Sequence, residues 1–257
     1  MNNRIIQVYK NIKHDVDLLN RIYLYLNNTI SYVEKLIKVE RRTEKIIMTE
    51  IEQKANDLLS IDQSLINGIN ADLILIPKYE YTQDFSIDNY RRDSQTNRVI
   101  ISILNIPSLS LNQSSLTQYE AETILLHQMT HILGFQYEQY NYFPGGITNV
   151  ITSKVDSTGK TRFYIKTPTV VEFAKNYYNC DNLIGVELDN QNNNNIPSSH
   201  WDSRILLGEY MNSELYTPEI VISDFTLALL EDSGWYQASL YSALQKSSKT
   251  APYCTLL

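Results

Sequence analysis

The segment 125–135, Leu-Leu-His-Gln-Met-Thr-His-Ile-Leu-Gly-Phe, places His127 and His131 four residues apart. On a helix this spacing brings both side chains to one face, one turn apart, where they can bind the same metal ion. Two core histidines that are satisfied by hydrogen bonds would have the same spacing. The pair therefore indicates a metal site only if further ligands and a suitable helix accompany it.

His200 is the only plausible third histidine ligand among the four histidines of the chain. It follows an asparagine-rich loop in the run Ser-Ser-His-Trp-Asp, whereas His14 lies in a polar N-terminal segment and is expected at the surface. Three imidazoles would leave one tetrahedral position open, which is typical of catalytic zinc sites. The alternative is a lone loop histidine with no ligand role.

The helix that must carry His127 and His131 has clear start and stop signals. Thr117-Gln-Tyr-Glu120 matches a capping box, in which the Thr side chain and the Glu side chain each accept from the other residue's backbone N–H. The sequence thus predicts a largely buried helix over 118–133, with Gly134 at the left-handed C′ position. A stop there lets the chain turn beneath a metal and return a third ligand.

Other elements follow from apolar periodicity. Ala71–Pro77 and 97–106 are predicted as strands, and 15–66 is predicted as helical because apolar residues recur at three- and four-residue steps without Gly or Pro. A strand around Leu36–Val39 is the alternative within that region. Further along the chain we expect a hairpin within 141–169, a helix over 170–178, a flexible loop over 189–199 and a helix from Ser223 to Asp232.

Composition restricts the classes of protein. The 257 residues are 43% hydrophobic and 20% charged, as expected of a globular chain, and the net charge of -7 argues against a nucleic-acid binder. The basic run 35–45 is expected to be a solvated helix face.

No apolar run approaches the length of a membrane span, and no signal peptide is expected at the start as written. The two cysteines, Cys180 and Cys254, could pair.

Several motifs together resemble the leishmanolysin-like metallopeptidases, a metzincin family. The family pattern is His-Glu-x-x-His-x-x-Gly-Phe, a long insertion, a third His followed by Trp, and a methionine turn. The matching stretches here are 127–135, His200-Trp201, Glu209-Tyr-Met211-Asn, the run 220–236, and an upstream strand at 70–76.

The resemblance implies an α+β, metzincin-like fold in which a twisted, mostly parallel sheet packs on the active-site helix. It implies an N-terminal helical region at 1–69, an upper subdomain with the sheet and active-site helix at 70–134, and a mainly helical lower subdomain at 135–257. Zinc would be the cofactor, with His127, His131 and His200 as ligands. Met211 would form the hydrophobic floor beneath them, and Trp201 is expected to pack in the core.

Gln128 is the main departure from the family pattern, because the family has its general base, a glutamate, at this position. Glutamine has nearly the same shape but cannot accept a proton, so peptide hydrolysis should be severely impaired while zinc binding survives. Glu120 and Glu122 are not expected to replace the base, since one serves the helix cap and the other points away from His127.

Two interpretations of Gln128 remain open. The chain is either a catalytically inactive pseudopeptidase that binds protein partners or serves as a structural subunit of a larger assembly, or an active zinc metalloendopeptidase captured as an inactive Glu-to-Gln mutant that would otherwise cleave a peptide substrate. A content of two cysteines favours the first, since the family is cysteine-rich. No nucleic-acid partner is expected. Members of the family are usually secreted or lie at the cell surface.

Overall fold

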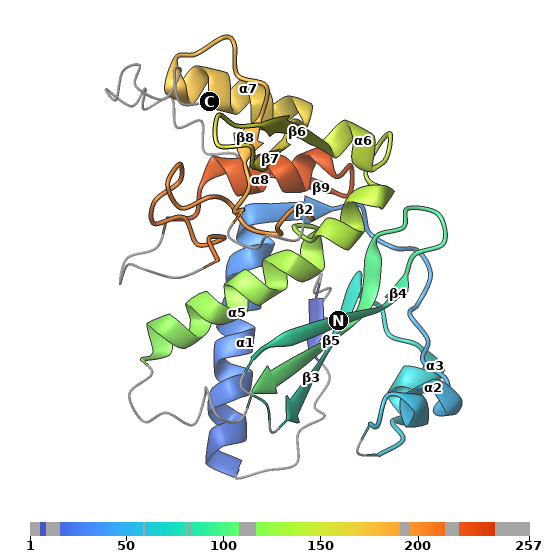
Figure 1. Cartoon of the computed structure of the whole chain (residues 1–257). Helices are drawn as coiled ribbons and strands as arrows, with labels where there is room; N and C mark the ends of the chain where they lie inside the picture. Colours follow the sequence, from blue (N-terminus) through green and yellow to red (C-terminus); the bar gives the residue numbers. More distant parts are fainter. Residues whose placement is uncertain are drawn as a thin grey trace. The chain divides into compact units, whose positions relative to one another are not determined.

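The structure is a computed structural model, and it describes residues 6–8, 16–58, 60–80, 82, 84–107, 117–190, 196–213 and 221–239. The chain forms two compact units (Figure 1). The first comprises Met1–Lys35 and Val39–Ile132, and the second comprises Leu36–Lys38 and Leu133–Leu257. The division into 1–69, 70–134 and 135–257 stays a prediction.

The first unit contains a four-stranded sheet of order β1-β3-β5-β4, formed by β1 (Ile6–Val8), β3 (Leu73–Glu80), β5 (Val99–Pro107) and β4 (Ser86–Arg92). β1, β3 and β5 are parallel, and β4 pairs antiparallel with β5. The two strands predicted from apolar runs are therefore confirmed as β3 and β5. β4 was not predicted, because its polar sequence lies at a sheet edge and lacks an apolar run.

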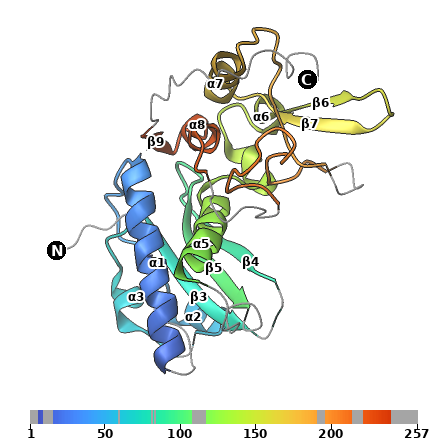
Figure 2. The same cartoon turned by 90° about the vertical axis from the view of Figure 1, so that its left-hand side faces the viewer.

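Helices cover both faces of this sheet (Figures 1 and 2). On one side lie α1 (Val16–Leu36) and α5 (Gln118–Leu133), and on the other α2 (Glu50–Ala55) and α3 (Gln63–Asn67). Side chains alternate along a strand, so Ile74 and Ile76 share a face, on which the core includes Ile46, Met48 and Leu65. Strands buried on both faces are apolar at almost every position, which is why they could be predicted from sequence.

Within the predicted helical region 15–66, α1, α2 and α3 are helices, and the prediction is wrong for 37–49, directly after Leu36. α1 ends there, and β2 (Ile37–Val39) follows and pairs with β9 (Tyr236–Ala238), which confirms the alternative strand. The basic run 35–45 is consequently not a helix face. Arg41 lies 2.7 Å from the buried carboxylate of Asp72, and Arg42 forms an ion pair with Asp93.

Helix α1 is fixed against helix α5. The Asn28 amide donates to Glu122 Oε1 at 2.7 Å, and the Thr29 hydroxyl donates to the Glu122 carbonyl at 3.4 Å. The apolar stripe of α1 is buried at Ile22, Leu26, Ile30 and Val33. The hydrogen bonds from Asn28 and Thr29 therefore hold α1 against the side of α5 on which Glu122 lies.

The second unit contains the helical segments η1 (Tyr137–Tyr142), α6 (Ile147–Val150), α7 (Pro168–Tyr178) and α8 (Asp224–Asp232). It also contains a three-stranded antiparallel sheet of β6 (Ile151–Val155), β7 (Thr161–Ile165) and β8 (Val186–Glu187). The predicted hairpin and both predicted helices are confirmed. Cys180, after α7, is buried and disulfide-bonded, and Cys254 lies outside the described residues.

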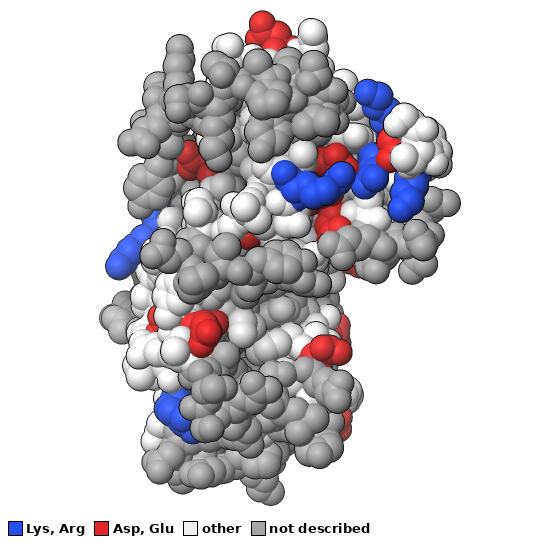
Figure 3. Space-filling view, turned by 60° about the vertical axis from the view of Figure 1, so that its left-hand side comes forward, with Lys and Arg blue, Asp and Glu red and all other residues white. Residues whose placement is uncertain are grey.

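Charged side chains of the second unit form a mixed network. Arg162 lies 2.8 Å from Asp156 and 3.5 Å from Glu187, and Arg204 lies 2.8 Å from Glu187 and 2.6 Å from Asp202. Among the described residues on the face drawn in Figure 3, basic and acidic side chains lie near one another. Within the described part of the chain, no helix is long and apolar enough to cross a membrane.

Candidate metal centre

Helix α5 begins with the predicted capping box. The Thr117 backbone N–H donates to Glu120 Oε2 at 2.7 Å, and the Glu120 N–H donates to Thr117 Oγ1 at 3.2 Å. The helix ends at Leu133, and Gly134 has a positive φ of +155°. This angle differs from the left-handed helical value of about +57° that was expected at C′. The boundaries of α5 are thus the predicted ones, with a different backbone conformation at Gly134.

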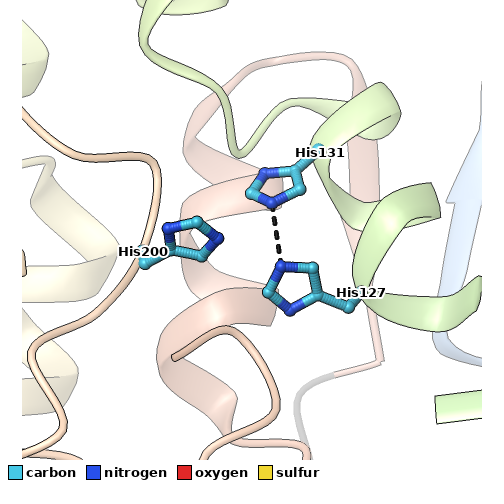
Figure 4. Close-up of side chains that lie close together, drawn as sticks. All are labelled: His127, His131 and His200. Carbon is cyan, nitrogen blue, oxygen red and sulfur yellow. Dashed lines mark hydrogen bonds between the residues drawn. The ribbon is translucent and has the colours of Figure 1, made fainter. Parts of the chain in front are cut away.

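His127 and His131 lie on one face of α5, as their spacing predicts. Their Nε2 atoms are 3.0 Å apart, and their ring planes are inclined at 82°. Each side chain is 8% exposed, so both rings are largely removed from water. Figure 4 shows both rings directed toward the same point, where a single ion could contact both Nε2 atoms.

His200 comes from a loop and completes a three-histidine group. The three histidines each offer a ring nitrogen, and these atoms all lie within 4.8 Å of one another (Figure 4). Two imidazole ligands of tetrahedral zinc have nitrogens about 3.3 Å apart, given Zn–N bonds of about 2.0–2.1 Å. The donor type and number therefore fit one zinc ion with an open fourth position, and the 3.0 Å between the Nε2 atoms of His127 and His131 is close to that spacing.

The backbone around His200 is held by neighbouring segments of the second unit. The His200 carbonyl accepts from the Asp189 N–H at 3.0 Å, and the Trp201 N–H donates to the Met211 carbonyl at 3.0 Å. Trp201 is fully buried, and its ring centroid lies 4.8 Å from that of Phe135. The expected packing role of Trp201 is confirmed. Met211 is fully buried as well, and its role as a floor under a metal stays a prediction.

Glu209 is a buried carboxylate that sequence reasoning did not identify. Its oxygens accept from the hydroxyls of Thr226 at 2.6 Å and Ser223 at 2.9 Å, and from the Met211 N–H. Burial raises the pKa of Glu209 from 4.5 to about 7, although these hydrogen bonds act in the opposite direction. Ser223, a capping residue by its position before α8, makes no side-chain cap bond, and its hydroxyl donates to Glu209 instead.

Gln128 lies between the two histidines in sequence and is half-buried. Within the described residues its side-chain amide makes no hydrogen bond. The neighbouring carboxylates are engaged elsewhere, since Glu120 accepts from Thr117 and Glu122 accepts from Asn28 and Gln118. Neither carboxylate is therefore free to act as a base beside His127.

A model of the leishmanolysin family matches residues 17–255 of this chain, which includes every candidate site residue. The chain belongs to the leishmanolysin family. The family consists of zinc metallopeptidases, so the expected family and α+β fold are confirmed. The three histidines can hold the metal that this family binds.

Individual relatives match over shorter segments. The leishmanolysin-like peptidase of Drosophila pseudoobscura pseudoobscura is 45% identical over 73 residues, 28% of this chain and 10% of that protein. The ciliated left-right organizer metallopeptidase of Xenopus laevis is 27% identical over 161 residues, 59% of this chain and 22% of that protein. The leishmanolysin homolog of Crithidia fasciculata is 28% identical over 145 residues, 56% of this chain and 21% of that protein. The chain thus aligns with less than a quarter of the length of these relatives.

Proposed function

We propose that this leishmanolysin-family domain binds zinc through His127, His131 and His200 but hydrolyses peptide bonds slowly or not at all. The observation that carries the proposal is a metal-competent histidine group whose helix has Gln128 where the family has its general base. The domain then acts by binding protein partners or as a structural subunit of a larger assembly.

The chemistry of Gln128 separates metal binding from catalysis. Zinc, when bound, supplies Lewis acidity that lowers the pKa of water and polarises a carbonyl. Hydrolysis also needs a residue that collects the proton of the attacking water and passes it to the leaving amine. A glutamine amide can hydrogen-bond that water but cannot take its proton, and the loss of a general acid–base typically costs about 10²–10⁴ in rate.

The alternative function is an active zinc metalloendopeptidase that carries an inactivating Glu-to-Gln change. It is favoured by the near-identical shape of the two side chains and by the intact capping box and helix around them. In that case the site would recover activity from a single reversion, and its substrates would be peptides.

Nucleic acid is not part of the proposal. The net charge of -7 offers little attraction for phosphate. Protein or peptide partners suit a peptidase-derived domain better.

A reversion assay distinguishes the two functions. Gln128→Glu is loaded with zinc and tested on unfolded protein, beside the unmodified chain and Gln118→Glu, the same chemical change at the exposed start of α5. Unchanged low cleavage by Gln128→Glu, with zinc bound, supports a non-catalytic domain. A gain of about 10²-fold or more that is lost again in Gln128→Glu/His131→Ala would establish the peptidase alternative.

A further inference from the structure

Glu209 is a buried acidic side chain that the proposed metal site does not use. It is 3% exposed, and every neighbour that hydrogen-bonds it in the described residues is a donor. Two are the hydroxyls of Thr226 and Ser223, and a third is the Met211 backbone N–H. A buried carboxylate is costly unless it is hydrogen-bonded, and these three donors supply such bonds.

The direction of the hydrogen bonds links Glu209 to Trp201. The indole Nε1 of Trp201 can only donate, and it lies 2.8 Å from Thr226 Oγ1. Thr226 accepts this bond, so its own proton is available for Glu209 Oε1 at 2.6 Å. The chain of bonds therefore runs one way, from the indole through Thr226 to the carboxylate. Both Trp201 and Thr226 are fully buried, which excludes water as a substitute partner.

The same carboxylate holds the methionine turn. One oxygen accepts from the Met211 N–H, and the Met211 carbonyl in turn accepts from the Trp201 N–H. Glu209 thus holds Trp201 twice, through the side chain by way of Thr226 and through the backbone by way of Met211. Trp201 directly follows His200, so these contacts fix the backbone at the third histidine.

We propose that Glu209 is a positioning residue for the metal centre, which acts through Thr226 and Met211 to hold His200 ready for zinc. This inference rests on the proposed zinc binding. Removing a group that orients a metal ligand in this way typically weakens metal binding about 10–100-fold. The role of the buried Glu209 carboxylate would then be to support metal binding and not to take part in peptide hydrolysis.

The test uses the full chain freed of metal and titrated with zinc alone, in competition with a chromogenic chelator. Three variants are compared with the unmodified protein. Glu209→Gln replaces one carboxylate oxygen with an amide NH2 group. This group cannot accept hydrogen bonds from the donors around it. Thr226→Val keeps the shape and removes the hydroxyl, whereas Thr226→Ser removes a methyl group and keeps the hydroxyl. Asp232→Asn, on the same helix as Thr226 but outside this network, is the control.

We expect about 10–100-fold weaker zinc binding for Glu209→Gln and Thr226→Val, with affinity near that of the unmodified chain for Thr226→Ser and Asp232→Asn. Cobalt absorption spectra of the same variants should show a distorted ligand geometry only for the first two. Unchanged zinc affinity in folded Glu209→Gln or Thr226→Val would overturn the positioning role. Equal weakening by Thr226→Ser and Thr226→Val would also overturn it, because packing and not the hydroxyl would then be responsible. If the unmodified chain binds no zinc, it is the proposed function that fails.

Discussion

The Nε2 atoms of His127 and His131 lie 3.0 Å apart, close to the separation of about 3.3 Å that tetrahedral zinc imposes on two imidazoles. Little movement is needed for both to bind one ion. We therefore predict that one zinc per chain stabilises the fold, by about 2.7 kcal/mol when free zinc is a hundredfold above Kd. Thermal unfolding with and without zinc measures the stabilisation, and metal analysis measures the number of zinc ions per chain.

The control for zinc binding is a histidine outside the metal-site motifs. His131→Ala should lose most of the zinc-induced rise in Tm, whereas His14→Ala, at a position outside the described residues, should keep it. A chelator should reverse the rise in the unmodified chain. A zinc-induced rise that survives in His131→Ala would place the metal elsewhere.

Glu209 makes stability depend on pH in a defined direction. Its pKa is 4.5 in an unfolded chain and is raised by burial to about 7 in the folded one. Between these values the folded state holds a proton that the unfolded state has released, so the free energy of unfolding falls as pH rises from 4.5 to 7. The contribution amounts to about 3 kcal/mol and is fully present only below pH 4.5.

Glu209→Gln isolates this contribution, since glutamine does not titrate. In metal-free protein, the difference in the free energy of unfolding between the unmodified chain and Glu209→Gln should shrink or reverse as pH rises through 7. Denaturant unfolding at several pH values gives the two curves. Parallel curves between pH 4.5 and 7 would mean that the pKa of Glu209 is not raised by burial.

Elements with local signals could be predicted from sequence. Thr117, Glu120 and Gly134 mark the start and end of α5, and the boundaries 118–133 followed from them. The end of α1 could not be predicted, because β2 exists through pairing with β9, about two hundred residues later in the chain. A segment without Gly or Pro can form a helix. Pairing with a distant strand can still end that helix.

The candidate site shows the same limit. Histidine spacing and the Trp that follows His200 predicted three ligands that the structure does bring together. Glu209 could not be identified as a buried network residue, because its partners Ser223 and Thr226 come from a later helix start. A single glutamate between Gly208 and Tyr210 gives no sign in the sequence that its carboxylate is buried.

Asp232 caps a helix other than its own. Its carboxylate accepts from the backbone N–H groups of Thr169 at 3.0 Å and Val170 at 3.2 Å, in the first turn of α7, whereas the N-cap Thr167 makes no side-chain cap bond. Asp232→Ala should therefore lower the free energy of unfolding by about 1 kcal/mol. Denaturant unfolding measures the change, and Glu231→Ala, at the neighbouring position outside the cap, should stay within about 0.5 kcal/mol of the unmodified chain.

Gly185 allows β8 to approach β7. A Cβ added there would lie 2.4 Å from the Ile165 carbonyl oxygen, and backbone atoms cannot move aside as a flexible side chain can. We predict that Gly185→Ala destabilises the second unit by about 1–3 kcal/mol and displaces the strand that leads to Leu188, which bridges to Trp201. Gly159→Ala is the contrasting change, since a Cβ there meets nothing within 4 Å and only its φ of +82° costs about 1–2 kcal/mol.

Zinc titration distinguishes Gly185→Ala from Gly159→Ala further. Gly185→Ala should weaken zinc binding because it disturbs the support of His200, while Gly159→Ala should leave it unchanged. Equal zinc affinity in both variants would show that β8 does not support the third histidine.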